Sequence, residues 1–394
     1  MHVIYDIFLA FLGKNVYNRG KNHPKEVGKL GSKQNQTRGV LLGCAVGDAM
    51  GHTVDKKTLA EICEDYGPNG LLGYDLVNGY ADVTSYTQLA AFSANGLLLG
   101  LTRKKLQGRM APPSRYIALA IKEWSRSQHY SAPERNFCWL STVPQLKRRF
   151  CMDTRMLDAL NKDALGTLEL PQYRSTHPGA LTTVIPVALL WEDLNLSQEE
   201  LDRLGAEAVA LTHGDPDAFL SGAVLTHMLS SLLREPEISM QELLQQTVNS
   251  IQMQFGREYG HTTRIWELLQ LAMTLSTMTH IAPMDAMEQL GCRSASEVLA
   301  GAVYSIATCE GDFDTAMITA VNHSGRSAAV GAVTGALLGA VLGQQALPEF
   351  YLESLEPTAA LLELADDLTS GCPMMPGSSL FDDDWDRKYL HAGT

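Results

Sequence analysis

Two stretches decide how this chain folds: AVNHSGRSAAVGAVTGALLGAVLG at residues 320–343 and YADVTSYTQLAAFSANGLL at residues 80–98. The first ends in GALLGAVLG, whose glycine and alanine spacing suits close packing against another helix. Its apolar run is too short to cross a membrane, which takes about 20 residues. In the second, apolar residues recur at three- and four-residue spacing from residue 89 to residue 101. This spacing predicts a helix with one buried face.

The same helical spacing continues through most of the chain. It is found at residues 201–211, 218–233, 240–253, 263–278 and 295–307. Convincing alternating runs of the kind that strands show are absent from the sequence. Proline and glycine separate these segments at Pro112-Pro113, Pro178-Gly179, Gly214 with Pro216, and Gly311. The pattern predicts an all-α fold of many packed helices.

The two ends of the chain differ from its middle. Residues 1–36 are rich in lysine, arginine, asparagine and glycine. We expect a basic, flexible N-terminal arm there, with one short amphipathic turn at residues 4–12. A single helical domain is predicted over residues 37–372, and residues 373–394 are expected to be a C-terminal tail.

Composition narrows the class of protein. Of the 394 residues, 45% are apolar, which is enough for a large core, and the net charge is −13. A nucleic-acid-binding surface is normally basic, so no nucleic-acid partner is expected. The seven cysteines lack paired metal-ligand spacing, a pattern typical of free thiols in a reducing cytoplasm. No membrane-spanning run or signal peptide is expected. We therefore predict a cytoplasmic protein and leave its oligomeric state open.

With a third segment, GVLLGCAVGDAMGHTVD at residues 39–55, the two stretches resemble the ADP-ribosylglycohydrolase family. This family includes the ADP-ribosyl-dinitrogen reductase glycohydrolases and the J1-crystallins. HPGALTTVIPVALL at residues 177–190 and the THGDP element within residues 210–229 are similar to further family segments, and the resemblance covers residues 38–370. It implies a compact orthogonal multi-helix bundle. Residues 103–171 are the least similar part and are expected to form a variable cap or loop region.

In that family the two opening stretches read S/T-D-D-T-Q and H-S-G-D-S-D-S/T-T, and their acidic residues hold two Mg²⁺ or Mn²⁺ ions. Such hard ions need oxygen ligands, mainly carboxylates. This chain lacks the carboxylates in both motifs, so we expect no metal cofactor at these vestigial positions. They are occupied here by Thr84, Ser85, Tyr86, Arg326, Ala328 and Ala329.

Arg326 is the most consequential of these substitutions. A fixed cation at this position would repel a divalent ion. We interpret it as a replacement for the metal's charge, which pairs with Asp48 or Asp55, or grips a phosphate with two hydrogen bonds. In the family the two motifs face each other across the active cleft, so the resemblance implies that Tyr86 lies against Arg326, where a guanidinium can stack on the aromatic face. The alternative is that Arg326 points into solvent from the start of a helix.

Asp48 and Asp55 remain as candidate catalytic carboxylates. Many family members carry a glutamate at the position of Asp55, where it contacts substrate or takes part in acid–base chemistry. Each residue also has a structural interpretation: Asp48 as a helix cap or a buried hydrogen-bond centre, and Asp55 as the N-cap of a helix that starts near Lys56.

Other positions carry weaker predictions. His213, in THGDP, would shape the rim of the site or simply be a buried, hydrogen-bonded histidine. His323 and Ser324 would keep the turn geometry ahead of Arg326, and Thr183 stands where the family has an arginine. The predicted substrate-binding set is Thr84, Ser85, Tyr86, His213, Gly325 and Arg326.

The sequence GDFDT at residues 311–315 imitates the family's metal motif but lies outside its place in the family pattern. We therefore predict that Asp312 and Asp314 cap a helix over residues 316–321 instead of binding metal.

Two hypotheses follow. The first is a non-catalytic family member that binds ADP-ribose, a related nucleotide or an ADP-ribosylated ligand. The J1-crystallins suggest that the fold serves roles outside catalysis. The alternative is an active hydrolase for the glycosidic bond of ADP-ribosylated substrates. It would use Asp48, Asp55, Thr84 and Ser85 with one Mg²⁺ or Mn²⁺ ion or none, and Asp82 as a displaced ligand. The loss of carboxylates from two separate motifs favours the first hypothesis.

Overall fold

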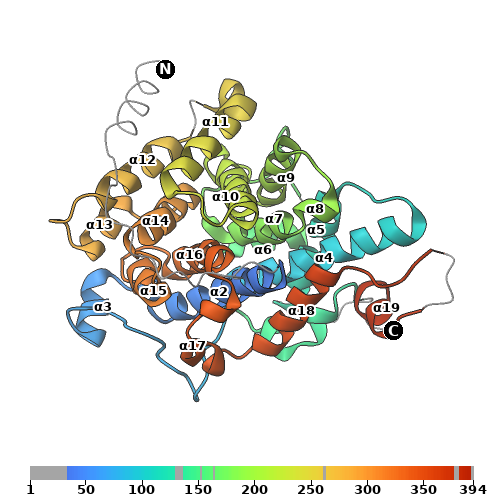
Figure 1. The fold of residues 1–394 in the computed structure, drawn as a ribbon, viewed down its shortest axis with the longest axis horizontal. Helices are drawn as coiled ribbons and strands as arrows, with labels where there is room; N and C mark the ends of the chain where they lie inside the picture. The colour runs from blue at the N-terminus through green and yellow to red at the C-terminus, as the bar shows by residue number, and fades with distance from the viewer. Residues whose placement is uncertain are drawn as a thin grey trace.

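A computed structural model describes residues 33–128, 136–150, 153–162, 165–260, 263–376 and 381–391. Figure 1 shows helices packed in several directions around a central pair. The α-helices are α2 (Lys33–Val54), α3 (Leu59–Tyr66), α4 (Ser85–Gln107), α5 (Pro113–Ser127), α6 (Thr154–Asn161), α7 (Ile185–Leu189), α8 (Trp191–Leu194), α9 (Gln198–Ala210), α10 (Pro216–Arg234), α11 (Met240–Tyr259), α12 (Ile265–Ser276), α13 (Pro283–Leu290), α14 (Ala295–Thr308), α15 (Phe313–Val321), α16 (Ser327–Leu342), α17 (Glu349–Ser354), α18 (Thr358–Ser370) and α19 (Asp383–Tyr389). The 3₁₀-helices are η1 (Trp139–Thr142), η2 (Pro144–Lys147), η3 (Pro178–Val184) and η4 (Gln344–Ala346).

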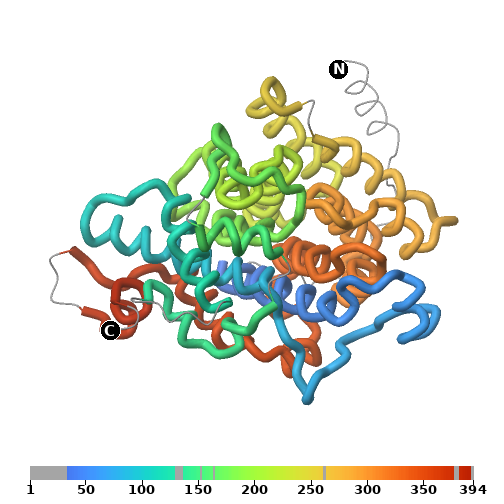
Figure 2. Tube along the Cα trace, turned by 180° about the vertical axis from the view of Figure 1, so that it is seen from behind, coloured from blue at the N-terminus to red at the C-terminus, as the bar shows by residue number. Residues whose placement is uncertain are grey.

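The central pair consists of α2 and α16, which lie side by side in both views (Figure 1, Figure 2). The two helices are antiparallel, and their backbones touch through facing glycines spaced four residues apart. A Cβ atom built on Gly43 would overlap the carbonyl oxygen of Gly335, and one built on Gly47 would overlap that of Gly331. Only glycine lets two backbones approach this closely. The glycines therefore fix the register between the two helices.

That register positions the candidate site. It places the C-terminal end of α2 against the N-terminal end of α16, so that Asp55 meets the backbone of Ala328. The start of α4 is held against the same end of α2, because Asp48 of α2 accepts hydrogen bonds from it. The motifs at residues 80–98 and 320–343 thus meet at one end of the central pair.

The all-α fold predicted from the sequence is confirmed. Each stretch with helical spacing lies within, or nearly coincides with, one helix; residues 240–253, for example, fall in α11, and residues 295–307 in α14. Among the residues that the structure describes, β pairing is limited to two isolated bridges, Val77 with Tyr80 and Ala81 with Leu355. None of the helices in these residues has the length and apolarity needed to cross a bilayer.

The structure differs from the predicted domain boundaries at both ends. Residues 33–36, which we assigned to the basic arm, form the first turn of α2, and the amphipathic turn predicted at residues 4–12 lies outside the described residues. The predicted tail contains α19, whose Trp385 indole N–H donates to Thr102 Oγ1 at 2.9 Å. The expected loop region at residues 103–171 contains α5 and α6.

Candidate functional site

Asp48 is fully buried and serves as the hydrogen-bond acceptor for the start of α4. Its carboxylate accepts from the backbone N–H groups of Thr84 and Thr87, at 2.8 and 3.0 Å, and from both of their hydroxyls at 2.6 Å. An anion at this end of a helix is stabilised by the unpaired N–H groups and the helix dipole. Burial raises the pKa of Asp48, and these hydrogen bonds oppose that rise. The structure thus agrees with its interpretation as a buried hydrogen-bond centre.

Asp55 and Arg326 form the ion pair that the sequence suggested. Asp55 Oδ2 lies 3.9 Å from Arg326 Nη1, and Asp55 Oδ1 accepts from the backbone N–H of Ala328 at 3.3 Å. The Asp55 side chain is only 2% exposed, while that of Arg326 is 28% exposed. Burial raises the pKa of Asp55, partly offset by the Ala328 hydrogen bond and the Arg326 charge. The suggested role of Asp55 as an N-cap near Lys56 is wrong, because Thr58 caps that helix.

Tyr86 occupies the interior beside this ion pair. Its side chain is 1% exposed, and its hydroxyl is buried with no hydrogen-bond partner in the described residues. Burial raises the pKa of Tyr86 well above its usual range, and the nearby charges of Asp55 and Arg326 also act on it. The charge of Arg326 thus acts on Tyr86, but the predicted stacking of Arg326 on the Tyr86 ring is not among the cation–π contacts of the described residues.

These residues do not fit a dinuclear Mg²⁺ or Mn²⁺ centre. Asp48 already accepts four hydrogen bonds, and Asp55 faces a guanidinium instead of an open space. Ala328 and Ala329 are buried at the start of α16 and offer no oxygen from their side chains. Hard divalent ions need several oxygen ligands, and this set supplies too few.

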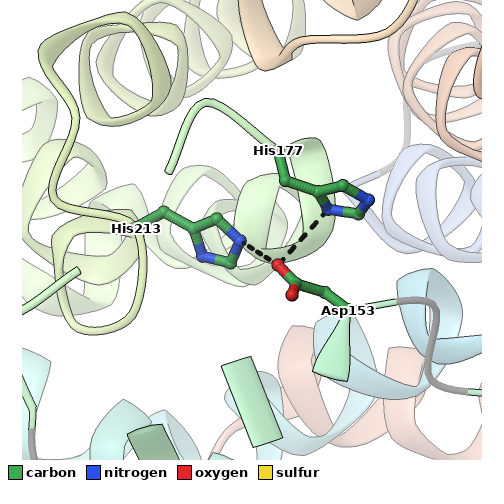
Figure 3. Close-up of side chains that lie close together, drawn as sticks. All are labelled: Asp153, His177 and His213. Atoms are coloured by element: carbon green, nitrogen blue, oxygen red, sulfur yellow. Dashed lines mark hydrogen bonds and ion pairs between the residues drawn. The ribbon is translucent and has the colours of Figure 1, made fainter. Parts of the chain in front are cut away.

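A second polar cluster lies in the interior close to Tyr86. It joins Asp153, the N-cap of α6, to His177, the N-cap of η3, and to His213 in the turn before α10. Figure 3 shows one carboxylate oxygen of Asp153 pointing between the two imidazoles. That oxygen lies 2.8 Å from His213 Nε2 and 3.4 Å from His177 Nδ1.

The charges of this cluster and of the Asp55–Arg326 pair affect one another's neighbours. Burial lowers the pKa of His177 to about 4, and the Arg326 charge contributes in the same direction. Burial opposes ionisation of Asp153, but the hydrogen bond and charge of His213 outweigh it and hold the pKa of Asp153 well below its usual range. The charge of Asp153 in turn raises the pKa of Tyr86 slightly further. The two clusters therefore share one polar interior.

His177 also lines a surface cavity of about 470 Å³. Three exposed arginines line it as well, and none of them forms an ion pair with a carboxylate of the described residues. The lining residues are Arg155, Arg174, Ser175, Thr176, His177, Arg293, Ser294 and Glu297. The cavity is suited to a negatively charged ligand.

The other predicted residues have mainly structural contacts. His323 Nδ1 accepts from the N–H of Gly325 at 2.9 Å, and Ser324 Oγ accepts from that of Leu59, which agrees with their predicted role in the turn. A Cβ on Gly325 would crowd the backbone of Cys292. Ser85, 3% exposed, is the first residue of α4. The Thr183 hydroxyl is buried and donates to Ala180 O.

Two further predictions concern Asp82 and the GDFDT segment. Asp82 pairs with Arg148 instead of serving as a displaced metal ligand. Asp312 caps α15 as predicted, accepting from the N–H of Thr315, but Asp314 does not cap it; its carboxylate accepts from the Tyr351 hydroxyl.

Sequence reasoning missed Asp153 and His177. Asp153 falls in the least family-like region, where no motif marked it. His177 stood at the head of a quoted segment, and its position directly before Pro178-Gly179 was the one available signal. The sequence predicted His213 as a site residue but did not predict its partners.

Comparisons with known proteins agree on one family. A family model described as ADP-ribosylglycohydrolase matches residues 31–376. A solved structure described as an ADP-ribosylglycohydrolase-related protein complex is similar, with a TM-score of 0.52 and 21% sequence identity over 86% of this chain and 98% of that chain. At this identity the likeness concerns the fold alone. No curated protein sequence matches the chain.

Proposed function

Because the chain belongs to the ADP-ribosylglycohydrolase family, we propose that it is a non-catalytic member that binds ADP-ribose or a related nucleotide. The observation that carries this proposal is the ion pair of Arg326 with Asp55, at 3.9 Å. A fixed cation at this place substitutes for the charge of a metal ion without its Lewis acidity. Asp48, the other carboxylate retained in the family motifs, is engaged by the start of α4.

A negatively charged ligand is supported by the distribution of arginines. Arg326 is partly exposed, and its charge reaches His177, which lines the cavity with Arg155, Arg174 and Arg293. A guanidinium binds phosphate oxygens through two parallel hydrogen bonds. The diphosphate of ADP-ribose has the charge and the geometry that these groups recognise.

One observation favours the alternative of an active hydrolase. The buried carboxyl of Asp55 has a raised pKa, as a general acid requires. In that case Asp55 would donate a proton to a leaving group, while Arg326 would only hold the substrate. The two functions differ in whether an ADP-ribosylated substrate is turned over.

We also propose a cytoplasmic setting. The cysteines in the described part of the chain are all free thiols, which suits a reducing compartment: Cys44, Cys63, Cys138, Cys292, Cys309 and Cys372.

Isothermal titration with ADP-ribose tests the proposal. We expect micromolar binding without added Mg²⁺ or Mn²⁺, weakened about tenfold or more by Arg326→Ala, since a charge-assisted bidentate contact is worth about 1.4 kcal/mol or more. Arg203→Ala is the matched control, because Arg203 is an exposed arginine already paired with Glu169 and Glu207. Absence of binding at millimolar ADP-ribose would contradict the proposal. Release of ADP-ribose from a modified protein, abolished by Asp55→Asn, would establish the hydrolase instead.

A further inference from the structure

We infer that Asp153, His177 and His213 form a binding site for a borderline transition-metal ion such as Zn²⁺, at a place separate from the family's Mg²⁺ and Mn²⁺ positions. The inference is independent of the proposed nucleotide binding. The three side chains come from different parts of the sequence, yet each places one ligand atom within 4.8 Å of the other two (Figure 3).

The distances are close to those of a tetrahedral site. With metal–ligand bonds of about 2.0–2.1 Å, neighbouring ligand atoms lie about 3.3 Å apart. Asp153 Oδ2 is 3.4 Å from His177 Nδ1 and 2.8 Å from His213 Nε2. An ion therefore needs only a small outward movement of His213 relative to Asp153.

The ligands are oriented by hydrogen bonds on their far sides. Asp153 Oδ1 accepts from the N–H groups of Arg155 and Met156, which leaves Oδ2 facing the imidazoles. His213 Nδ1 lies 2.9 Å from Thr212 Oγ1, a contact that fixes the orientation of the ring. Outer contacts of this kind hold metal-binding histidines and carboxylates in position.

The protonation of His177 leaves its Nδ1 available as a ligand atom. Its Nδ1 accepts from the N–H of Gly179 at 3.0 Å, so the proton is on Nε2, which is buried and has no partner among the described residues. In this tautomer Nδ1 carries no proton, and it lies 3.4 Å from Oδ2 of the Asp153 carboxylate. A cation at this point replaces repulsion with attraction, at the cost of the Gly179 hydrogen bond.

Gly179 keeps room beside the ligands. A Cβ there would lie 3.1 Å from His177 Nδ1 and 3.3 Å from His213 Nε2, which is tighter than ordinary van der Waals contact. A side chain at this position would press into the space between the two imidazoles.

The donor set selects the ion. Two imidazoles and one carboxylate suit Zn²⁺, Co²⁺ or Ni²⁺, whereas Mg²⁺ prefers oxygen alone. Three protein ligands leave a fourth position open, as in catalytic sites. His177 also lines the arginine-rich cavity, so the proposed ion would lie close to a place where an anion can bind.

The test is titration of the full-length protein with Zn²⁺ alone, followed by Co²⁺, whose visible absorption reports the coordination geometry of the bound ion. We expect one ion per chain with micromolar or tighter affinity, weakened at least about tenfold by His177→Ala and by Asp153→Asn. His177 is partly exposed, so its variant is the one expected to fold most readily. His227→Ala is the matched control: His227 and Asp202 form a buried pair at 2.8 Å without a second histidine.

Zn²⁺ affinity lost in the His177 and Asp153 variants and kept in His227→Ala supports the site. Equal affinity in His177→Ala and the unchanged protein overturns it, as does the absence of micromolar binding by the unchanged protein. ADP-ribose titration of the same variants reports on the proposed function separately.

Discussion

At the scale of single residues, the two carboxylates that the sequence left in place have different roles. Asp48 is committed to the start of α4 through four hydrogen bonds. Asp55 keeps one unsatisfied oxygen, which faces Arg326 across 3.9 Å. Of the two, only Asp55 is paired with a substituted side chain, so the effect of the Arg326 substitution is concentrated on its environment.

Arg326→Ala should therefore lower the free energy of unfolding by about 1–3 kcal/mol, because it leaves the Asp55 carboxylate buried without a counter-charge. Arg264→Ala is a matched control: Arg264 lies 3.9 Å from Glu297 but is 70% exposed, and its loss should cost less than about 1 kcal/mol. Arg326→Lys should restore only part of the stability, since an ammonium cannot reproduce the guanidinium's planar contacts. Urea unfolding of the three variants measures these differences, and equal losses in both alanine variants would contradict the account.

His323 gives a prediction about pH. Burial lowers the pKa of His323 to about 4 from 6.5, so the unfolded state binds more protons between these values. Stability from this group is present at neutral pH and is lost as the pH falls from about 6.5 to about 4, at up to about 1.4 kcal/mol per pH unit. His323→Asn keeps an acceptor for the Gly325 N–H but does not titrate. Its unfolding free energy should fall less steeply over this range, and parallel curves for the two proteins would refute this assignment.

At the scale of helices, the glycine contacts between α2 and α16 are the strictest requirement of the fold. Gly43→Ala or Gly335→Ala forces the two backbones apart and should cost about 3 kcal/mol or more. Gly256→Ala, in α11, is the control: its Cβ would meet only Gln252 Cβ at 3.8 Å, and the change should stabilise by up to about 1 kcal/mol. Thermal unfolding measures both, and tolerance of alanine at Gly43 would show that the close approach is not needed.

Most of the long helices could be predicted, because apolar residues recur in them at three- and four-residue spacing. α4 and α14 follow directly from such spacing. The ion pair of Arg326 could be predicted because a resemblance placed both partners in facing motifs. Asp153 could not, since its contact with His213 joins residues 60 positions apart and no periodic signal marks either side chain. The docking of α19 was missed for the same reason: Trp385 meets Thr102 from the far end of the chain.

At the scale of the whole molecule, the chain has the helical bundle of its family. The glycine-packed pair brings the two motifs together. The family resemblance implies that Ser85, Tyr86, Arg326 and Ala328 stand where carboxylates would hold metal. Because the backbone register survives, the missing ligands can be replaced. Metal affinity needs the complete set of ligands, so no single substitution should restore it.

Isothermal titration with Mn²⁺ tests most directly the prediction that this chain has no dinuclear metal centre. Two proteins are compared, one with the five ligand positions restored and one without. Both carry His177→Ala, so that the Asp153 cluster does not contribute to metal binding. The protein with only this change should show no micromolar site. Restoration of the five ligand positions together should create Mn²⁺ binding, through Ser85→Asp, Tyr86→Asp, Arg326→Asp, Ala328→Asp and Ala329→Thr. Micromolar Mn²⁺ binding at one or two sites before restoration, or full recovery by Arg326→Asp alone, would contradict the account.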